Sequence, residues 1–203
     1  GKNHMNPAVL AEVQKHLAVD PERRFKLVAN LPYSVATPIL SNLLIAEPIP
    51  LTMTVTIQKE LGDRICAAPS TRDYSALSIW MQSQCRAEIV RIMGPTVFWP
   101  RPKVHSAIVH IEFDPARRAQ VDDLTFFHET VRALFCHRRK FLRSVMVSVM
   151  KDRLTKPQVD EVVAEMGFNE TTRAEELDVP TLIELCRVLK RKVGECAPSA
   201  LAT

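Results

Sequence analysis

Apolar and polar positions alternate differently in the two parts of this 203-residue chain. Up to about residue 114, short apolar runs alternate with amphipathic stretches. The run Leu51 to Ile57 carries threonine at every second position, which is typical of a strand with one buried face. Beyond Asp114-Pro115, apolar residues recur every three or four positions, as in helices. The pattern predicts an α/β domain at 1–114 and a small all-α domain at 115–203.

The periodicity places the elements of both parts. In the first we expect strands at 25–29, 51–57, 87–93 and 106–113, and helices at 7–18, 37–45, 59–68 and 76–85. In the second we expect helices at 124–136, 141–150, 156–166 and 179–192, and a frayed tail at 197–203. Asn6 should cap the first helix, Gly167 should end the third helix of the second part, and Asp178 should cap the last. Strands that alternate with helices predict a parallel sheet, with a short buried strand at 25–29 and an antiparallel final strand as an option.

Composition adds few constraints. The chain is 46% hydrophobic, and no apolar run approaches the length of a membrane span. Its five cysteines are scattered and never spaced C-x-x-C. We therefore expect reduced cysteines in a cytosolic protein, with no disulfide framework, no metal site and no membrane association.

The segment most suggestive of chemistry is Asn30-Leu31-Pro32-Tyr33, which directly follows the apolar run at 25–29. The Asn30 side-chain oxygen and the Leu31 carbonyl could accept the two N–H groups of an exocyclic amine and aim its lone pair at an electrophilic methyl group. Pro32 stiffens the turn without adding a donor. Tyr33 can stack on a base taken out of its helix or loop. A plain strand-to-helix turn with a half-buried tyrosine would use the same residues.

Further motifs follow in a fixed order. They are Thr37-Pro38, Gln58-Lys59-Glu60, Asp73-Tyr74-Ser75-Ala76-Leu77-Ser78, Phe98-Trp99-Pro100-Arg101-Pro102-Lys103-Val104-His105-Ser106-Ala107 and Phe135-Cys136-His137-Arg138-Arg139-Lys140. Over about residues 2–192 this succession resembles the ribosomal RNA adenine dimethyltransferases, which doubly methylate adenines near the 3′ end of small-subunit rRNA. Relatives that methylate large-subunit rRNA share the layout but more often have isoleucine after the asparagine, so they fit second.

The resemblance implies S-adenosylmethionine-dependent dimethylation of adenine N6. It also implies that 1–114 is the C-terminal part of a Rossmann-like methyltransferase domain, followed by a small helical rRNA-binding domain. Four consecutive residues would be catalytic: Asn30, Leu31, Pro32 and Tyr33. Asn30 would also face the cofactor, and Phe98 would line the base pocket opposite Tyr33, unless it is only a loop aromatic packed on the core. Trp99 stands where the family often has another residue, so the resemblance gives it no role.

The family's donor-binding motifs are missing from this chain. In the family a glycine-rich loop follows the first strand and an acidic residue ends the second, whereas the five glycines here form no G-x-G cluster. The opening at 1–7 resembles family sequence just downstream of the third cofactor motif. We therefore expect a fragment without the first half of its methyltransferase domain, inactive alone and unable to bind S-adenosylmethionine tightly. Exposed sheet edges should favour its self-association.

A basic stretch without acidic residues lies between Glu129 and Asp152, in a chain of net charge +4. A solvated helix face would normally mix in glutamates, so the stretch favours a polyanionic partner. The resemblance implies rRNA contacts for Arg138, Arg139, Lys140 and Arg143. Lys103 is either a further phosphate contact or simply an exposed lysine.

Three functions fit these observations. The first is a cytoplasmic enzyme that dimethylates adenines of 16S rRNA in the 30S subunit and takes part in subunit maturation. The second is an RNA-binding assembly factor whose catalysis is dispensable. The third, a DNA amine methyltransferase, is disfavoured because the Phe98 loop and the Arg138 segment match the rRNA enzymes.

Overall fold

The computed structural model describes residues 6–196, so the predictions for the opening at 1–5 and the tail at 197–203 lie outside the described residues. The chain divides into two compact units. The first comprises residues 6–67 and Trp80–Arg118, and the second comprises Ala68–Ile79 and residues 119–196. Residues 68–79, which a boundary after 114 assigns to the first domain, therefore pack with the helices of the second unit.

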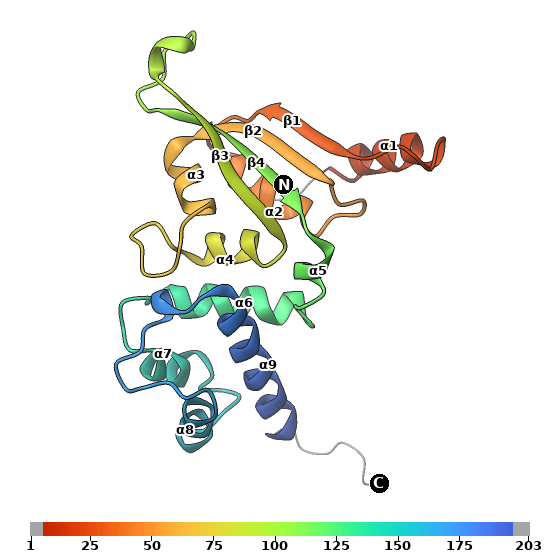
Figure 1. Ribbon diagram of the computed structural model, residues 1–203. Helices are drawn as coiled ribbons and strands as arrows, with labels where there is room; N and C mark the ends of the chain where they lie inside the picture. The colour runs from red at the N-terminus through yellow and green to blue at the C-terminus, as the bar shows by residue number, and fades with distance from the viewer. Residues whose placement is uncertain (1–5, 197–203) are drawn as a thin grey trace. The chain divides into compact units, whose positions relative to one another are not determined.

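A four-stranded sheet forms the centre of the first unit (Figure 1). The elements of the first unit are α1 (Pro7–Ala18), β1 (Lys26–Asn30), α2 (Ala36–Leu43), β2 (Thr52–Gln58), α3 (Lys59–Ile65), β3 (Cys85–Met93), the 3-10 turn η1 (Pro95–Val97), β4 (Ser106–Phe113) and α5 (Pro115–Arg118). The remaining helix of this part of the chain, α4 (Ala76–Gln82), has residues in both units. The strand order is β1-β2-β4-β3. β1 and β2 are parallel, and β4 runs antiparallel to both β2 and β3. The predicted α/β fold with an antiparallel final strand is confirmed, but the sequence did not indicate that this strand lies inside the sheet.

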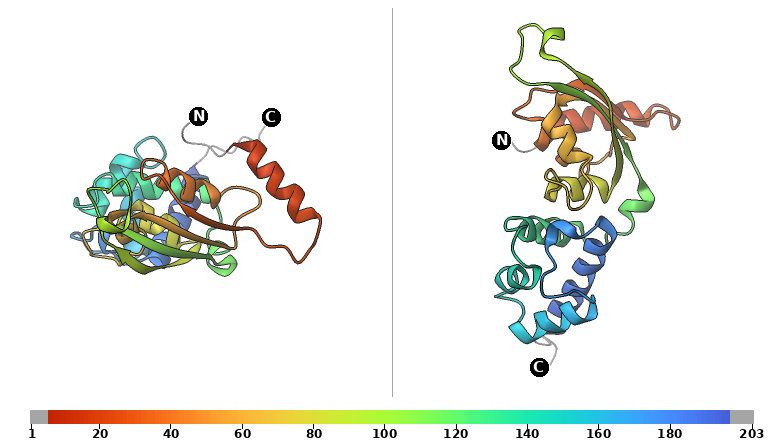
Figure 2. Two further views of the ribbon diagram at one scale, coloured as in Figure 1. Left: turned by 90° about the horizontal axis from the view of Figure 1, so that it is seen from above. Right: turned by 60° about the vertical axis from the view of Figure 1, so that its left-hand side comes forward.

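The core of the first unit follows from the two-residue period of β2. Met53, Val55 and Ile57 are at most 1% exposed, while the intervening residues are half-buried. α3 packs across β2, β3 and β4, which form one twisted layer (Figure 2). Its Gly62 makes this close approach possible, because a Cβ there would lie only 3.1 Å from a methyl group of Val109 on β4.

The expectation of a buried strand at 25–29 is wrong. β1 pairs with β2 alone among the described strands, and Val28 is 80% exposed. Lys26 and Asn30 share its exposed face, whereas Leu27 and Ala29 face partly inward. The sequence shows an apolar run, but burial depends on which elements cover it.

Helices form the second unit: α6 (Leu124–Phe135), α7 (Leu142–Val149), α8 (Lys156–Glu165) and α9 (Val179–Cys196), with a 3-10 turn η2 (Ala174–Glu176) before α9. Their predicted ends are confirmed within a few residues. Gly167 follows α8 with φ +66°, a conformation that suits glycine and ends the helix. The Asp178 carboxylate accepts the Thr181 N–H at 2.9 Å and so caps α9, as predicted.

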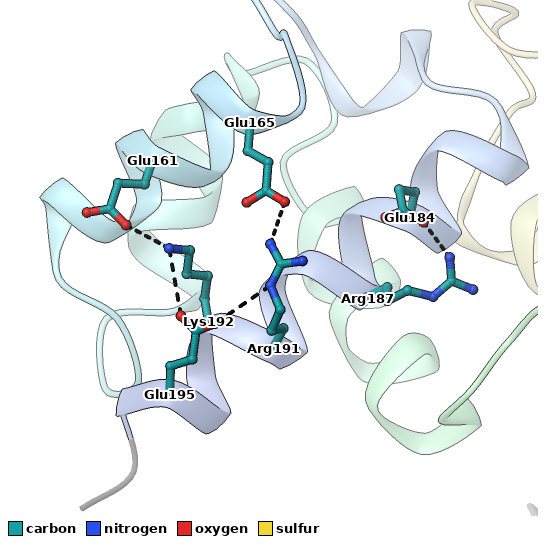
Figure 3. A network of polar contacts seen from close by, with 7 residues as sticks. All are labelled: Glu161, Glu165, Glu184, Arg187, Arg191, Lys192 and Glu195. Atoms are coloured by element: carbon teal, nitrogen blue, oxygen red, sulfur yellow. Dashed lines mark hydrogen bonds and ion pairs between the residues drawn. The ribbon is translucent and has the colours of Figure 1, made fainter.

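Ion pairs link α8 to α9 (Figure 3). Lys192 lies 2.8 Å from Glu161, and Arg191 pairs with Glu165. Nearer the start of α9, Arg187 contacts Asp122 at 2.9 Å and also pairs with Glu184. Lys190 completes the set with Asp123 at 2.8 Å. The cations of α9 are thus largely occupied within the second unit.

Candidate active site and RNA-binding surface

The Asn30–Tyr33 segment lies at the carboxyl end of β1 in the first unit. The Leu31 N–H donates to the Thr56 carbonyl at 3.1 Å, which extends the parallel ladder by one residue, and the Leu31 side chain is buried. The Val35 N–H then donates to the Pro32 carbonyl at 3.1 Å and turns the chain into α2. Among the described residues, neither the Asn30 side chain nor the Leu31 carbonyl has a hydrogen-bond partner. Both acceptors therefore remain available to a ligand.

Tyr33 is fixed by a contact that the sequence did not reveal. Its hydroxyl lies 2.7 Å from the Ser106 Oγ, across 73 positions of the chain. Ser106 is fully buried at the start of β4, where it pairs with Gln58 of β2 and Met93 of β3. This central position holds the half-buried tyrosine ring at one end. The signal in the sequence was only that Ser106 belongs to the motif that begins at Phe98 and ends at Ala107.

A cavity of about 340 Å³ joins the two motifs. Its lining consists of Asn30, Leu31, Pro32, Tyr33, Phe98, Trp99, Pro100 and Pro102. The volume lies at the lower end of the range for small-molecule sites, about 300–1,000 Å³. Segments 68 positions apart in sequence, at Asn30 and Phe98, thus meet around a space with aromatic and polar walls. Their predicted roles toward a base stay predictions.

Arg138, one of the predicted RNA contacts, makes hydrogen bonds and an ion pair within the second unit. Its guanidinium donates to the Tyr74 carbonyl and, at 2.7 Å, to the Arg72 carbonyl. Its Nε lies 3.4 Å from a carboxylate oxygen of Glu175, and the side chain is 24% exposed. Burial raises the pKa of Tyr74, whose neutral hydroxyl donates to the Leu177 carbonyl at 2.9 Å. Arg138 therefore ties the 68–79 segment to the helices around it.

Arg143 is also paired. It makes two hydrogen bonds to Asp160, at 2.5 and 2.9 Å, which raise the pKa of Arg143 and lower that of Asp160. By contrast, Arg139, Lys140 and Lys103 are exposed and make no ion pair with any described residue. The basic stretch thus contains two structural arginines and a turn with free cations at 139–140.

Neither a metal cluster nor a membrane-spanning helix occurs in the described part of the chain. Residues 6–196 contain no group of three or more histidine, cysteine, aspartate or glutamate side chains suited to a metal ion. No helix within the same range has the length and apolar character needed to cross a membrane.

The sheet and helices of the first unit form a Rossmann-like α/β fold, and the second unit is helical. Residues 3–188 match the family described as ribosomal RNA adenine dimethylase, and this chain belongs to that family. A "Ribosomal RNA small subunit methyltransferase A" of Listeria innocua is 40% identical over 197 residues, which cover 95% of this chain and 66% of the relative. The protein of the same description from Halothermothrix orenii is 36% identical over 174 residues, 86% of this chain and 58% of the relative. The chain therefore spans less than two thirds of the length of these relatives.

Solved structures agree with the fold. A dimethyladenosine transferase from Plasmodium falciparum superposes with a TM-score of 0.74 at 18% identity, over 92% of this chain and 80% of that one. The 23S rRNA methyltransferase ErmE superposes with a TM-score of 0.55, also at 18% identity and over the same shares. The expected fold class is confirmed.

Proposed function

We propose that this protein dimethylates adenine N6 in the 3′-terminal hairpin of small-subunit rRNA, with S-adenosylmethionine as methyl donor. One observation carries the proposal: the cavity that brings Asn30–Tyr33 together with Phe98. Its support from relatives is their description as small-subunit rRNA methyltransferases, over almost the whole of this chain.

The acceptor side of the reaction can be assigned to particular atoms. An exocyclic amine is a poor nucleophile because its lone pair is delocalised into the ring. The Asn30 side-chain oxygen and the Leu31 carbonyl accept its two N–H groups, which increases electron density on the nitrogen and holds the lone pair, which lies perpendicular to the ring, toward the methyl donor. The nitrogen that accepts the methyl group becomes cationic and loses one proton to water. One hydrogen then remains, and one acceptor suffices to hold the amine. Tyr33 and Phe98 stack on the ring, and catalysis rests on positioning.

Few of the residues present could bind the methyl donor. S-adenosylmethionine supplies an electrophilic methyl group on a sulfonium, which leaves as a neutral thioether. The glycines of the described chain do not form a cradle for it. Gly62 packs against β4, Gly94 and Gly167 occupy separate turns, and Gly194 lies in α9. Only Asn30, at the end of β1, is a candidate donor contact, so we derive no step through the donor.

Binding to rRNA would use the free cations. Arg139 and Lys140 in the second unit and Lys103 in the first are exposed and unpaired within the described chain, and such cations contact phosphates. We propose the 30S subunit as partner, a role in its maturation and a cytoplasmic location, since these follow from an rRNA substrate. The second candidate is a non-catalytic assembly factor. The same free cations favour it, because they could bind RNA without any use of the cavity.

A methyl-transfer assay with the complete product of the gene distinguishes the dimethyltransferase from the assembly factor. Labelled S-adenosylmethionine and unmethylated small ribosomal subunits are incubated with the wild-type, Asn30→Ala and Ser34→Ala proteins. Ser34 is exposed, adjoins Tyr33 and does not line the cavity, so it serves as the matched control. We expect Asn30→Ala to lose methyl incorporation by about 100-fold or more, the scale of losing a positioned polar group, with subunit binding retained. Undiminished incorporation in Asn30→Ala would disprove its role, and wild-type binding without incorporation would favour the assembly factor.

A further inference from the structure

Trp99 is 95% exposed although it borders the cavity at Asn30–Tyr33. We propose that Trp99 stacks on the nucleobase next to the target adenine, and so forms a second base-binding position on the RNA. The proposal rests on the proposed function, since it takes the cavity to hold an adenine.

Two adjacent aromatic residues of the cavity, Phe98 and Trp99, differ in their exposure to solvent. Phe98 follows the 3-10 turn η1 with an extended backbone, φ −117° and ψ 148°. Phe98 is half-buried, whereas Trp99 stands almost wholly in solvent, yet both line the cavity. If a base is held between Phe98 and Tyr33, the base of the adjacent RNA nucleotide is within reach of the Trp99 indole.

The exposure of Trp99 points to a ligand. Large aromatic side chains are usually mostly buried, and an exposed indole beside a polar rim often marks a binding site. Neighbouring positions favour nucleic acid over a protein partner. Arg101 and Lys103 follow in the same loop, are exposed and make no ion pair with a described residue. An aromatic platform flanked by free cations is the usual arrangement for single-stranded RNA.

Intrinsic fluorescence can report on this residue separately. The chain contains two tryptophans, and the other, Trp80, is only 4% exposed. Stacking on a base quenches indole emission, so a ligand at the cavity should change the solvent-exposed Trp99 signal and leave that of Trp80. In Trp99→Phe the quench should disappear, while a ring remains to stack.

The experiment titrates the 203-residue chain with a labelled RNA hairpin that has two adjacent adenines in its loop. Anisotropy gives the Kd and tryptophan emission gives the quench. Matched arms use the same hairpin with abasic sites beside the adenines, and inorganic polyphosphate as a polyanion without bases. Trp99→Ala removes the ring, and Val97→Ala is the control, because Val97 is exposed in the same loop but does not line the cavity.

We expect Trp99→Ala to raise the Kd for the intact hairpin by about 5- to 150-fold, the range of base–aromatic stacking. Trp99→Phe should recover most of the affinity, Val97→Ala should match the wild type, and the abasic hairpin should reduce the effect of Trp99→Ala. Equal affinity of wild type and Trp99→Ala, or equal quenching by polyphosphate, would overturn the proposal while leaving the adenine site intact. If Trp99→Ala weakens hairpin binding but Asn30→Ala still incorporates methyl groups fully, the role assigned to Asn30 is wrong and that of Trp99 stands. Failure of the hairpin to bind any variant would overturn both.

Discussion

Replacing Arg138 with alanine should destabilise the second unit far more than the same change at Arg139. Arg138 donates to the carbonyls of Arg72 and Tyr74 and lies 3.4 Å from Glu175. Arg139 is exposed and makes no ion pair with a described residue. The two adjacent arginines thus form a matched pair, with similar charge and similar position but different partners.

The magnitude follows from the hydrogen bonds that the substitution removes. A hydrogen bond that involves a charged group contributes about 1.5–3 kcal/mol. The 24% exposure of the Arg138 side chain lets water replace part of two such bonds, so we expect a decrease of about 2–4 kcal/mol in the free energy of unfolding. Arg139→Ala should stay within about 0.5 kcal/mol. With a urea m-value of about 2 kcal/mol/M, the midpoint for Arg138→Ala falls by about 1–2 M.

Urea unfolding followed by far-UV circular dichroism measures this, since the second unit is mainly helical. Arg138→Lys is a useful third variant, because an ammonium cannot reproduce the planar fork that reaches two carbonyls, and it should recover about half of the decrease at most. Equal midpoints for Arg138→Ala and Arg139→Ala would refute the assignment of Arg138 to the 68–79 segment.

Two other predictions concern charge. The double variant Arg139→Ala/Lys140→Ala should weaken binding to the RNA hairpin and reduce the slope of log Kd against log salt by about 1.5–2, the change expected when two phosphate contacts are removed; an unchanged slope, measured by anisotropy at several salt concentrations, would place the RNA elsewhere. Hydrogen bonds from Thr181 lower the pKa of the Asp178 carboxyl below its ordinary value of 3.8, so its stabilising contribution is fully present above about 3.8 and is lost as pH falls through the lowered value. Asp178→Asn keeps a good cap but cannot titrate, so its urea midpoint should fall less than that of the wild type below pH 3.8; parallel acid profiles would contradict the link.

The elements with a clear period were predictable. The threonine alternation of β2 fixed its buried face, and β4 was placed at its observed bounds, since both signals are local. Pairing between distant strands has no such local signal. The insertion of β4 between β2 and β3, and the exposure of Val28 on β1, depend on which strands and helices meet in space.

The candidate site divides in the same way. The resemblance identified the two motifs that line the cavity, because their residues and order are visible in the chain. It could not show that the Ser106 hydroxyl holds Tyr33, since that hydrogen bond joins positions 73 apart. Charge alone also could not distinguish Arg138 from Arg139. The difference lies in the carbonyls of the 68–79 segment, whose position near Arg138 arises only in the folded second unit.

The central position of β4 also sets the order in which a nascent chain can complete its sheet. β2 can pair with β1 as soon as both have left the ribosome, but its other edge stays open until residues 59–105 and then β4 itself have been made. At about 5–20 residues per second, that edge is unpaired for roughly 3–11 seconds. During this interval Met53, Val55 and Ile57 lack their neighbours on β4, so the open edge of β2 could pair with another chain or be covered by a chaperone.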